Sequence, residues 1–382
     1  MRLSPILDEL GVYPFAELDA AKARARSQGV DLIDFGIGDP REGVEPFIRD
    51  ALIDALSGTA GYPRAAGLPM LSEAISDWLG WRFDVKIDPQ TEIVPTLGAK
   101  EAIFSFAQVV MDVAGGKDTV VVTEPGYPVA ARGARFAGAR VVELPLRRKL
   151  NYVPDLDSVA TELWHRTAIL WLNYPNNPTG ACAPESLYVR AAALAREHDF
   201  LVASDEAYSE LYFGEPPRSA LQVADRSRMV IFNSLSKRSS MTGYRAGFIA
   251  CASEIADALR LYRPTIGTAP QEFVQHAAVA AWRDEEHVER ARARYSRKRD
   301  LLLDVLSTRG CENAGGDASM FLWIAPPCSD DADTLALRLL EHGIVVTPGS
   351  ALGTSGESFV RFALVPTEDE CERAAEILME VV

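Results

Sequence analysis

The sequence has few cysteines and few histidines, and neither residue type is spaced as a metal site or a disulfide framework requires. Five cysteines and five histidines occur in 382 residues. The cysteines are odd in number and form no Cys-x-x-Cys pair, and the histidines form no His-Glu-x-x-His motif. We therefore expect reduced structural thiols and no protein-bound catalytic metal.

Long apolar runs and an excess of positive charge are also missing. No stretch approaches the ~20 uninterrupted apolar residues of a membrane-spanning helix. Asp8 and Glu9 interrupt the first residues before the apolar core of a signal peptide could form. The formal net charge of −15 disfavours nucleic acid or an anionic membrane as the main partner. We expect a cytoplasmic protein that binds small molecules.

From about residue 95 the sequence alternates short apolar segments with helical patterns. Segments rich in Val and Ile predict strands with their exit loops at 119–128, 139–146, 168–178, 200–208, 228–237 and 246–252. Most of them lack period-two alternation, which favours a largely parallel sheet buried on both faces and covered by helices such as 184–199. The sequence thus predicts an α/β fold with a mostly parallel central sheet flanked by helices.

The C-terminal part predicts a second, smaller α+β unit. Residues 285–310 form one long charged helical pattern, and strand-like segments "MFLWIAP", "GIVVTPG" and "SFVRFALV" follow, with helices at about 331–342 and 367–380. We expect the N-terminal arm to pack with this unit. The predicted domains are 1–45 for the arm and small-domain segment, 46–285 for the large domain and 286–382 for the C-terminal small domain.

Polar side chains follow several predicted strands, at the edge where open α/β sheets bind ligands. They are Asn173, Asn177, Asp205, Tyr208, Ser234, Ser236 and Lys237. A lysine amine can form a Schiff base with a carbonyl cofactor, and two serine hydroxyls with Arg245 suit a phosphate. The glycine turn in "TLGAKEAIF" (96–104) opens a helix whose free N–H groups also favour an anion. Each feature alone has an ordinary interpretation: a surface lysine, a helix start or, for Asp205, a helix N-cap.

Four motifs in the same chain order resemble the class I/II aminotransferases, which are pyridoxal-phosphate-dependent enzymes of fold type I. They are "NYPNNPTG" (173–180), "SDEAY" (204–208), "SLSKRSSMTGYRAGF" (234–248) and "FVRFALV" (359–365). "YPRAAGLPMLSEAI" (62–75) and "FGIGDP" (35–40) match as well, so the resemblance covers nearly the whole chain.

The resemblance implies a pyridoxal 5'-phosphate site in the large domain. Lys237 would be the Schiff-base lysine and the base for proton transfer, and Asp205 would pair with the pyridine nitrogen. Asn177 and Tyr208 would hydrogen-bond the phenolic oxygen of the cofactor, and Tyr127 would stack on its ring. The phosphate would be held by Ser234, Ser236, Arg245 and the backbone of Ala99 and Lys100.

The resemblance also implies how substrate and a second subunit take part. Arg361 would clamp the substrate carboxylate, beside Gly38 and Asn177, because a guanidinium suits that bidentate contact. Asn173 would support the loop on the Arg361 side. Tyr62 would reach the phosphate of a neighbouring subunit, which implies a homodimer with shared sites.

"SLSKRS" with "GYRAGF" is most similar to the succinyldiaminopimelate transaminase branch, which serves lysine biosynthesis. This predicts ping-pong transfer of an amino group from an L-amino acid, usually glutamate in this family, to N-succinyl-2-amino-6-oxopimelate or another 2-oxo acid. A distal substrate carboxylate would need a cation, and Lys100, Arg64 and Arg238 all stay open. Arg238 is itself a departure, because many members have threonine or another small residue after the lysine.

Other functions stay open at this point. One is an aspartate- or alanine-type aminotransferase, and another is a pyridoxal-phosphate-dependent lyase on the same fold. A nicotinamide-dependent dehydrogenase is disfavoured, because Gly36 and Gly38 begin a Gly-x-Gly-x-x-Gly motif that Arg41 breaks. A non-catalytic ligand-binding module is disfavoured because the residues expected for catalysis are all present.

Overall fold

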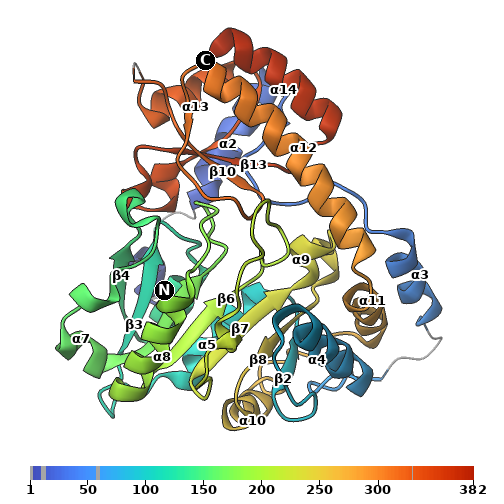
Figure 1. The fold of residues 1–382 in the computed structure, drawn as a ribbon, viewed down its shortest axis with the longest axis vertical. Coiled ribbons are helices and arrows are strands. Elements are labelled where there is room, and N and C mark those ends of the chain that lie inside the picture. Colours follow the sequence, from blue (N-terminus) through green and yellow to red (C-terminus); the bar gives the residue numbers. More distant parts are fainter. Residues whose placement is uncertain (1–2, 10–13, 57–60, 329) are drawn as a thin grey trace.

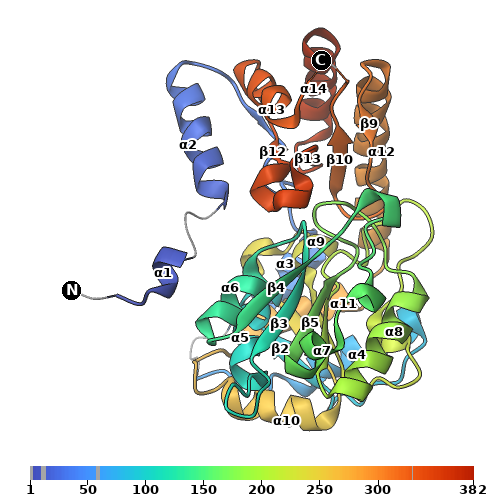
Figure 2. The same ribbon diagram turned by 90° about the vertical axis from the view of Figure 1, so that its left-hand side faces the viewer.

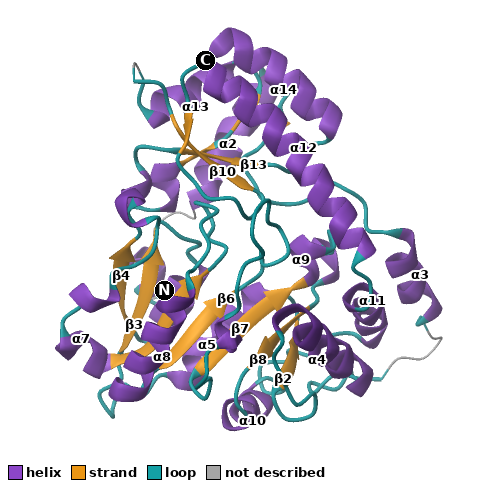
Figure 3. Ribbon diagram, in the orientation of Figure 1, coloured by secondary structure: helices purple, strands orange, loops and turns teal. Residues whose placement is uncertain are grey.

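The computed structural model describes residues 3–9, 14–56, 61–328 and 330–382. A seven-stranded sheet forms the centre of the larger part, in the order β2-β8-β7-β6-β5-β3-β4 (Figures 1 and 3). Its strands are β2 (Ile93–Thr96), β3 (Thr119–Glu124), β4 (Arg140–Pro145), β5 (Thr167–Asn173), β6 (Leu201–Asp205), β7 (Met229–Ser234) and β8 (Gly247–Ala250). The strands from β4 to β7 run parallel, which confirms the predicted mostly parallel sheet. β8 is antiparallel to both of its neighbours.

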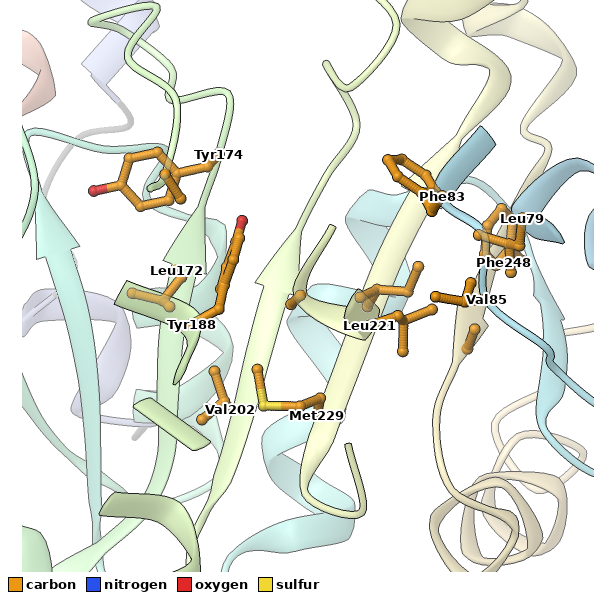
Figure 4. Close-up of a cluster of buried hydrophobic side chains, with 14 of the residues drawn as sticks. Leu79, Phe83, Val85, Leu172, Tyr174, Tyr188, Val202, Leu221, Met229 and Phe248 are labelled. Atoms are coloured by element: carbon orange, nitrogen blue, oxygen red, sulfur yellow. The ribbon is translucent and has the colours of Figure 1, made fainter. Parts of the chain in front are cut away.

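Helices cover both faces of this sheet, which is why its strands carry apolar residues without alternation. They are α3 (Pro46–Asp54), α4 (Pro69–Phe83), α5 (Ala99–Val110), α6 (Val129–Phe136), α7 (Thr161–Arg166), α8 (Glu185–His198), α10 (Ser253–Tyr262) and α11 (Glu272–Trp282). Along β7, Met229 and Ile231 join the core under α4, α8 and α11, whereas Val230 and Phe232 join the core under α5. Figure 4 shows the first of these cores, with Leu172, Val202 and Met229 rising from neighbouring strands.

The smaller part contains a four-stranded antiparallel sheet and a two-stranded parallel one. The first has the order β12-β13-β10-β9, and the second pairs β1 with β11. Their bounds are β1 (Ile33–Asp34), β9 (Glu312–Asn313), β10 (Phe321–Ala325), β11 (Ile344–Val345), β12 (Thr347–Pro348) and β13 (Val360–Ala363). The N-terminal strand therefore lies in the C-terminal part of the molecule. The domain boundaries at 45 and 285 stay a prediction.

The helices of this part surround the small sheets. They are α2 (Pro14–Ser27), α12 (Glu286–Thr308), α13 (Ala332–Glu341) and α14 (Glu368–Val381). Figure 2 shows α2 beside α13, while the short helix α1 (Ile6–Glu9) stands clear of both sheets. In Figure 1 the long helix α12 runs from the region of α9 (Leu235–Arg238) and α11 up to α14. No helix in the described ranges is both long and apolar enough to cross a membrane.

The two parts also meet at the carboxyl end of β3. Glu124 accepts hydrogen bonds from the backbone N–H and the hydroxyl of Ser355, at 2.8 and 2.7 Å. The backbone N–H of Gly126 donates to the carbonyl of Leu352 at 3.1 Å. A side chain at Gly353 would place its Cβ only 1.9 Å from the Glu124 carboxylate, so this approach requires glycine. The loop that carries Tyr127 is thus tied to the smaller part.

Candidate active site

A cavity of about 470 Å³ opens at the carboxyl ends of β5, β6 and β7 and is lined by residues from both parts of the molecule. Every residue that the resemblance assigns to the cofactor or to the substrate α-carboxylate lines it except Tyr62. Those residues are Gly38, Ala99, Lys100, Tyr127, Asn173, Asn177, Asp205, Tyr208, Ser234, Ser236, Lys237, Arg245 and Arg361. Parallel strands end at one edge of the sheet, and that geometry brings together residues far apart in sequence.

Lys237 lies on the one-turn helix α9, directly after β7. Its Nζ donates a hydrogen bond to the carbonyl oxygen of Gly38, on the opposite wall of the cavity. Burial lowers the pKa of Lys237 to about 8, and the charges of Arg245 and Arg361 act in the same direction while Asp39 opposes them. The neutral, nucleophilic form of the amine is therefore much more populated near neutral pH than it is for an ordinary lysine.

Asp205 is the last residue of β6 and is buried. Its Oδ1 accepts the backbone N–H of Ala207 at 3.2 Å. Burial nevertheless raises the pKa of Asp205 to about 6. A cationic nitrogen placed beside this carboxylate would favour the ionised form.

Hydroxyls and a guanidinium converge at the start of α5. The hydroxyl of Ser234 donates to that of Ser236 at 2.9 Å. Arg245 donates to the carbonyls of Thr242 and Leu97, at 2.8 and 3.1 Å, and these contacts hold its guanidinium against the helix start.

Gly98 makes that close approach possible. It is the N-cap of α5 and has a φ of 75°. A Cβ there would lie 2.6 Å from Nη2 of Arg245. Ala99 and Lys100, the first two residues of α5, line the same cavity, and the N–H groups of a helix's first turn are available to ligands. These donors together suit a phosphate dianion.

Arg361, on β13, is buried and has a fixed orientation. Its Nη1 donates to Oδ1 of Asn177 at 2.9 Å, and its Nη2 donates to the carbonyl of Gly36 at 2.6 Å. Asn177 in turn donates its backbone N–H to Asn173, which donates to the carbonyl of Asp205. A line of hydrogen bonds therefore joins the end of β6 to the guanidinium.

Aromatic residues form the remaining walls of the cavity. The Arg361 guanidinium lies 4.6 Å from the ring centre of Phe321, and Tyr208 packs edge-on against the same ring. Burial raises the pKa of Tyr208, so its hydroxyl stays protonated at neutral pH. The Lys100 Nζ lies 5.9 Å from the ring centre of Tyr127.

The structure separates the three cations that the sequence left open for a distal carboxylate. Lys100 lines the cavity. Arg64 is exposed and is not part of the cavity wall. Arg238, the third candidate left open, is buried elsewhere, pairs with Glu285 and does not line the cavity. Tyr62 is fully exposed and lies outside the cavity wall of its own chain.

Sequence reasoning missed part of the lining. The missed residues are Asp19, Ile37, Asp39, Ile103, Ala207, Thr242 and Phe321. Most of these lie within or beside the quoted motifs, so proximity to a motif was the available signal. Asp19 lies on α2, and only the tertiary fold brings that helix to the cavity.

The cavity fits a phosphorylated aldehyde together with a carboxylate substrate. Its volume falls in the usual range for cofactor pockets. It combines a reactive amine, a buried carboxylate and an oriented guanidinium with the phosphate cradle, which is our name for Ser234, Ser236, Arg245 and the first N–H groups of α5. Within the described ranges, no three or more His, Cys, Asp or Glu side chains come together as a metal site would require.

Comparison with known proteins gives consistent similarities. Residues 30–378 match the family described as "Aminotransferase class I and II". The chain is 35% identical over 379 residues to the LL-diaminopimelate aminotransferase of Dehalococcoides mccartyi, covering 98% of this chain and 97% of that protein. It superposes on an aminotransferase from Neisseria meningitidis with a TM-score of 0.91, 34% identity and 99% of each chain covered. A probable N-succinyldiaminopimelate aminotransferase from Thermus thermophilus gives a TM-score of 0.88 and 30% identity, covering 97% and 100% of the two chains.

Proposed function

This chain belongs to the class I and II aminotransferases, pyridoxal-phosphate-dependent transaminases of fold type I, and we propose that the cavity between its two parts is the transamination site, with Lys237 as the cofactor lysine. The observation that carries this proposal is the convergence of Lys237, Asp205 and Arg361 on one cavity. The phosphate cradle at the start of α5 would hold the phosphate group of the cofactor.

When bound, pyridoxal phosphate supplies an electron-accepting ring that weakens the bonds at the substrate α-carbon. The chain supplies the rest. Asp205 would keep the ring nitrogen protonated, and the neutral amine of Lys237 would take and return the proton through its Nζ. Arg361, oriented by Asn177, would fix the substrate carboxylate so that the α-proton faces that amine.

We propose a dicarboxylic 2-oxo acid with a diaminopimelate skeleton as the amino acceptor and glutamate as the donor. N-succinyl-2-amino-6-oxopimelate is the candidate that the sequence motifs favour. The 35% identity to an LL-diaminopimelate aminotransferase favours the free amino compound as a second candidate. In either case Lys100, the one of the three candidate cations that lines the cavity, would contact the distal carboxylate.

We also propose a homodimer with shared sites. Tyr62 is fully exposed, and an apolar groove of about 730 Å³ lies beside the phosphate cradle. Phe104, Val129 and Phe136 are among the residues that line it. Apolar surface of this kind commonly marks an interface. A second subunit seated there would bring its own Tyr62 near the cradle.

The test is spectroscopic. The purified protein, loaded with pyridoxal phosphate, is expected to show a yellow band that excess L-glutamate converts to the pyridoxamine form. Borohydride reduction followed by peptide mass spectrometry is expected to place the cofactor on Lys237, and Lys237→Ala is expected to abolish turnover. A labelled peptide that lacks Lys237 would overturn the assignment.

Acceptors are then compared in the second half-reaction. Conversion of the pyridoxamine form by the succinylated keto acid, but not by the free one, supports the first candidate, and the reverse supports the second. Turnover with 2-oxo acids of aspartate or alanine alone would favour a general aminotransferase. A yellow band that no amino donor converts would favour the lyase alternative.

A further inference from the structure

Arg238 follows Lys237 directly but lies in a different environment. Its side chain is buried, and it does not line the cavity. Burying a guanidinium is costly unless its hydrogen-bonding groups are satisfied. The contacts of Arg238 therefore indicate what the residue does for the lysine beside it.

The helix that carries Lys237 cannot hold its own position. α9 contains only four residues, one helical turn, and a single turn is unstable without tertiary contacts. At its start, the Ser234 hydroxyl accepts the backbone N–H of Ser236 at 3.1 Å. At its end, the anchoring contacts come from the side chains of Arg238 and Ser239.

The guanidinium of Arg238 is clamped to the junction between α11 and α12. Its Nη1 donates to the carbonyl of Ala281 at 2.7 Å. Its Nη2 donates to the carbonyl of Asp284 at 3.3 Å and to the carboxylate of Glu285. The guanidinium also lies 4.9 Å from the ring centre of Trp282. A planar fork can satisfy several acceptors together, which an ammonium group on a flexible stem cannot do.

Ser239 makes a second contact with the same junction. Its hydroxyl lies 2.8 Å from Nε2 of His287, and Nδ1 of His287 lies 2.6 Å from Asp284. His287 belongs to the first turn of α12, the long helix that reaches the smaller part of the molecule. Both residues after Lys237 are thus fastened to the start of that helix.

We propose that Arg238 is a positioning residue: its clamp on the α11–α12 junction fixes α9 so that the amine of Lys237 faces the cavity. This inference rests on the proposed role of Lys237. Arg238 does not contact the cavity and acts through the backbone of α9 alone. The residue that departs from the usual small side chain is therefore an anchor rather than a substrate contact.

The test compares holoenzyme variants with a matched control. Arg238→Met removes the clamp, and Arg238→Lys keeps the charge without the fork. The control is Lys298→Met, which removes another buried cation, paired with Glu42, from the middle of α12 and outside the clamp. Each variant is measured for its melting temperature, its kcat and KM for glutamate, and the pH midpoint of its visible absorption band.

Both Arg238 variants are expected to lower kcat about tenfold or more, since a misplaced base loses transition-state stabilisation, while KM stays within about twofold. The pH midpoint of the absorption band is expected to shift in both. Lys298→Met is expected to lower the melting temperature while leaving kcat and the midpoint unchanged.

Three results would overturn the proposal. One is an Arg238→Met enzyme with wild-type kcat and midpoint. Another is full rescue by Arg238→Lys, because charge alone would then suffice. The third is an equal loss of kcat in Lys298→Met. If Arg238→Met does not fold, Glu285→Gln serves instead, because it weakens the clamp while keeping its shape, and unchanged kcat and midpoint there would count against the proposal. A wild-type protein without any absorption band would instead refute the proposed function itself.

Discussion

At the scale of single residues, the site holds a charge that burial disfavours. The folded-state pKa of Asp205 is about 6, against its usual 3.8. Because this pKa is raised in the folded protein, ionisation of Asp205 destabilises the fold. The stability that the protonated form provides is fully present below about pH 4 and is lost as the pH rises through 6. The cofactor-free protein therefore carries a stability cost at neutral pH.

Asp205→Asn is expected to stabilise the cofactor-free protein at pH 7 while abolishing transamination. The shift of about two pKa units corresponds to roughly 3 kcal/mol at most in the free energy of unfolding. Urea unfolding at pH 4 and pH 7 measures it, and the gain should be present only at the higher pH. A variant whose pH dependence of stability matches that of the wild type would contradict this account.

Arg361→Ala is expected to raise the KM for amino acids by about a hundredfold or more, since it would remove the charge-assisted hydrogen bonds that we propose for the substrate carboxylate. The dissociation constant of the cofactor, measured by fluorescence quenching, should change little. Arg361→Lys should recover only part of the loss because the planar fork is missing. Equal losses of cofactor and amino-acid binding would point to a structural role.

At the scale of elements, the close approach of α5 to Arg245 depends on Gly98. Gly98→Ala introduces both an unfavourable φ of 75° and a Cβ at 2.6 Å from the guanidinium. We expect cofactor affinity to fall by about tenfold or more, because Arg245 must move away from the start of α5 and from the phosphate that it would bind there.

The control for this prediction is Gly138→Ala. Gly138 has a similar φ of 83°, but a Cβ there meets nothing within 4 Å. It should lose stability through the same backbone strain while keeping its affinity for the cofactor. Equal affinity losses in the two variants, measured by equilibrium titration with pyridoxal phosphate, would mean that backbone strain rather than the clash is responsible.

Helices and strands that have a clear pattern of apolar or charged residues could be predicted from the sequence. The apolar runs of β3 to β7 and the long charged pattern of α12 stand out without any tertiary information. The direction of β8 could not be predicted, because its residues are buried on both faces and such a strand has the same pattern in either orientation. The sequence analysis predicts strands only from about residue 95 onward, so it does not predict the short strand β2.

For the site, too, the sequence predicted some features, and others depend on tertiary packing. Motifs located the residues that follow each strand, but not the direction in which Arg238 points. On a one-turn helix, neighbouring side chains diverge by about 100°, so residues adjacent in sequence can face opposite surroundings. Only the packing of α9 against the α11–α12 junction decides which of the two faces the cavity.

At the scale of the whole molecule, the proposed homodimer with shared sites predicts that two defective variants can restore activity together, which two monomers could not do. Tyr62→Ala should weaken cofactor binding, and Lys237→Ala should be inactive. When the two proteins are unfolded and refolded together, each mixed dimer would contain one intact site. About a quarter of all sites, and of the wild-type activity, should therefore return. No recovery above the sum of the separate variants would contradict the shared-site dimer.

The pairing of β1 with β11 also constrains the order in which the chain can finish folding. Ile33 pairs with Ile344, so the N-terminal strand has no partner until more than 300 further residues have been made. At translation rates of about 5–20 residues per second, this interval lasts roughly 15–60 s. Ile33 and Phe35 are both buried in the finished molecule, and their partners Ile344 and Phe362 are absent throughout this interval. A strand that is made early in translation is thus among the last to be enclosed.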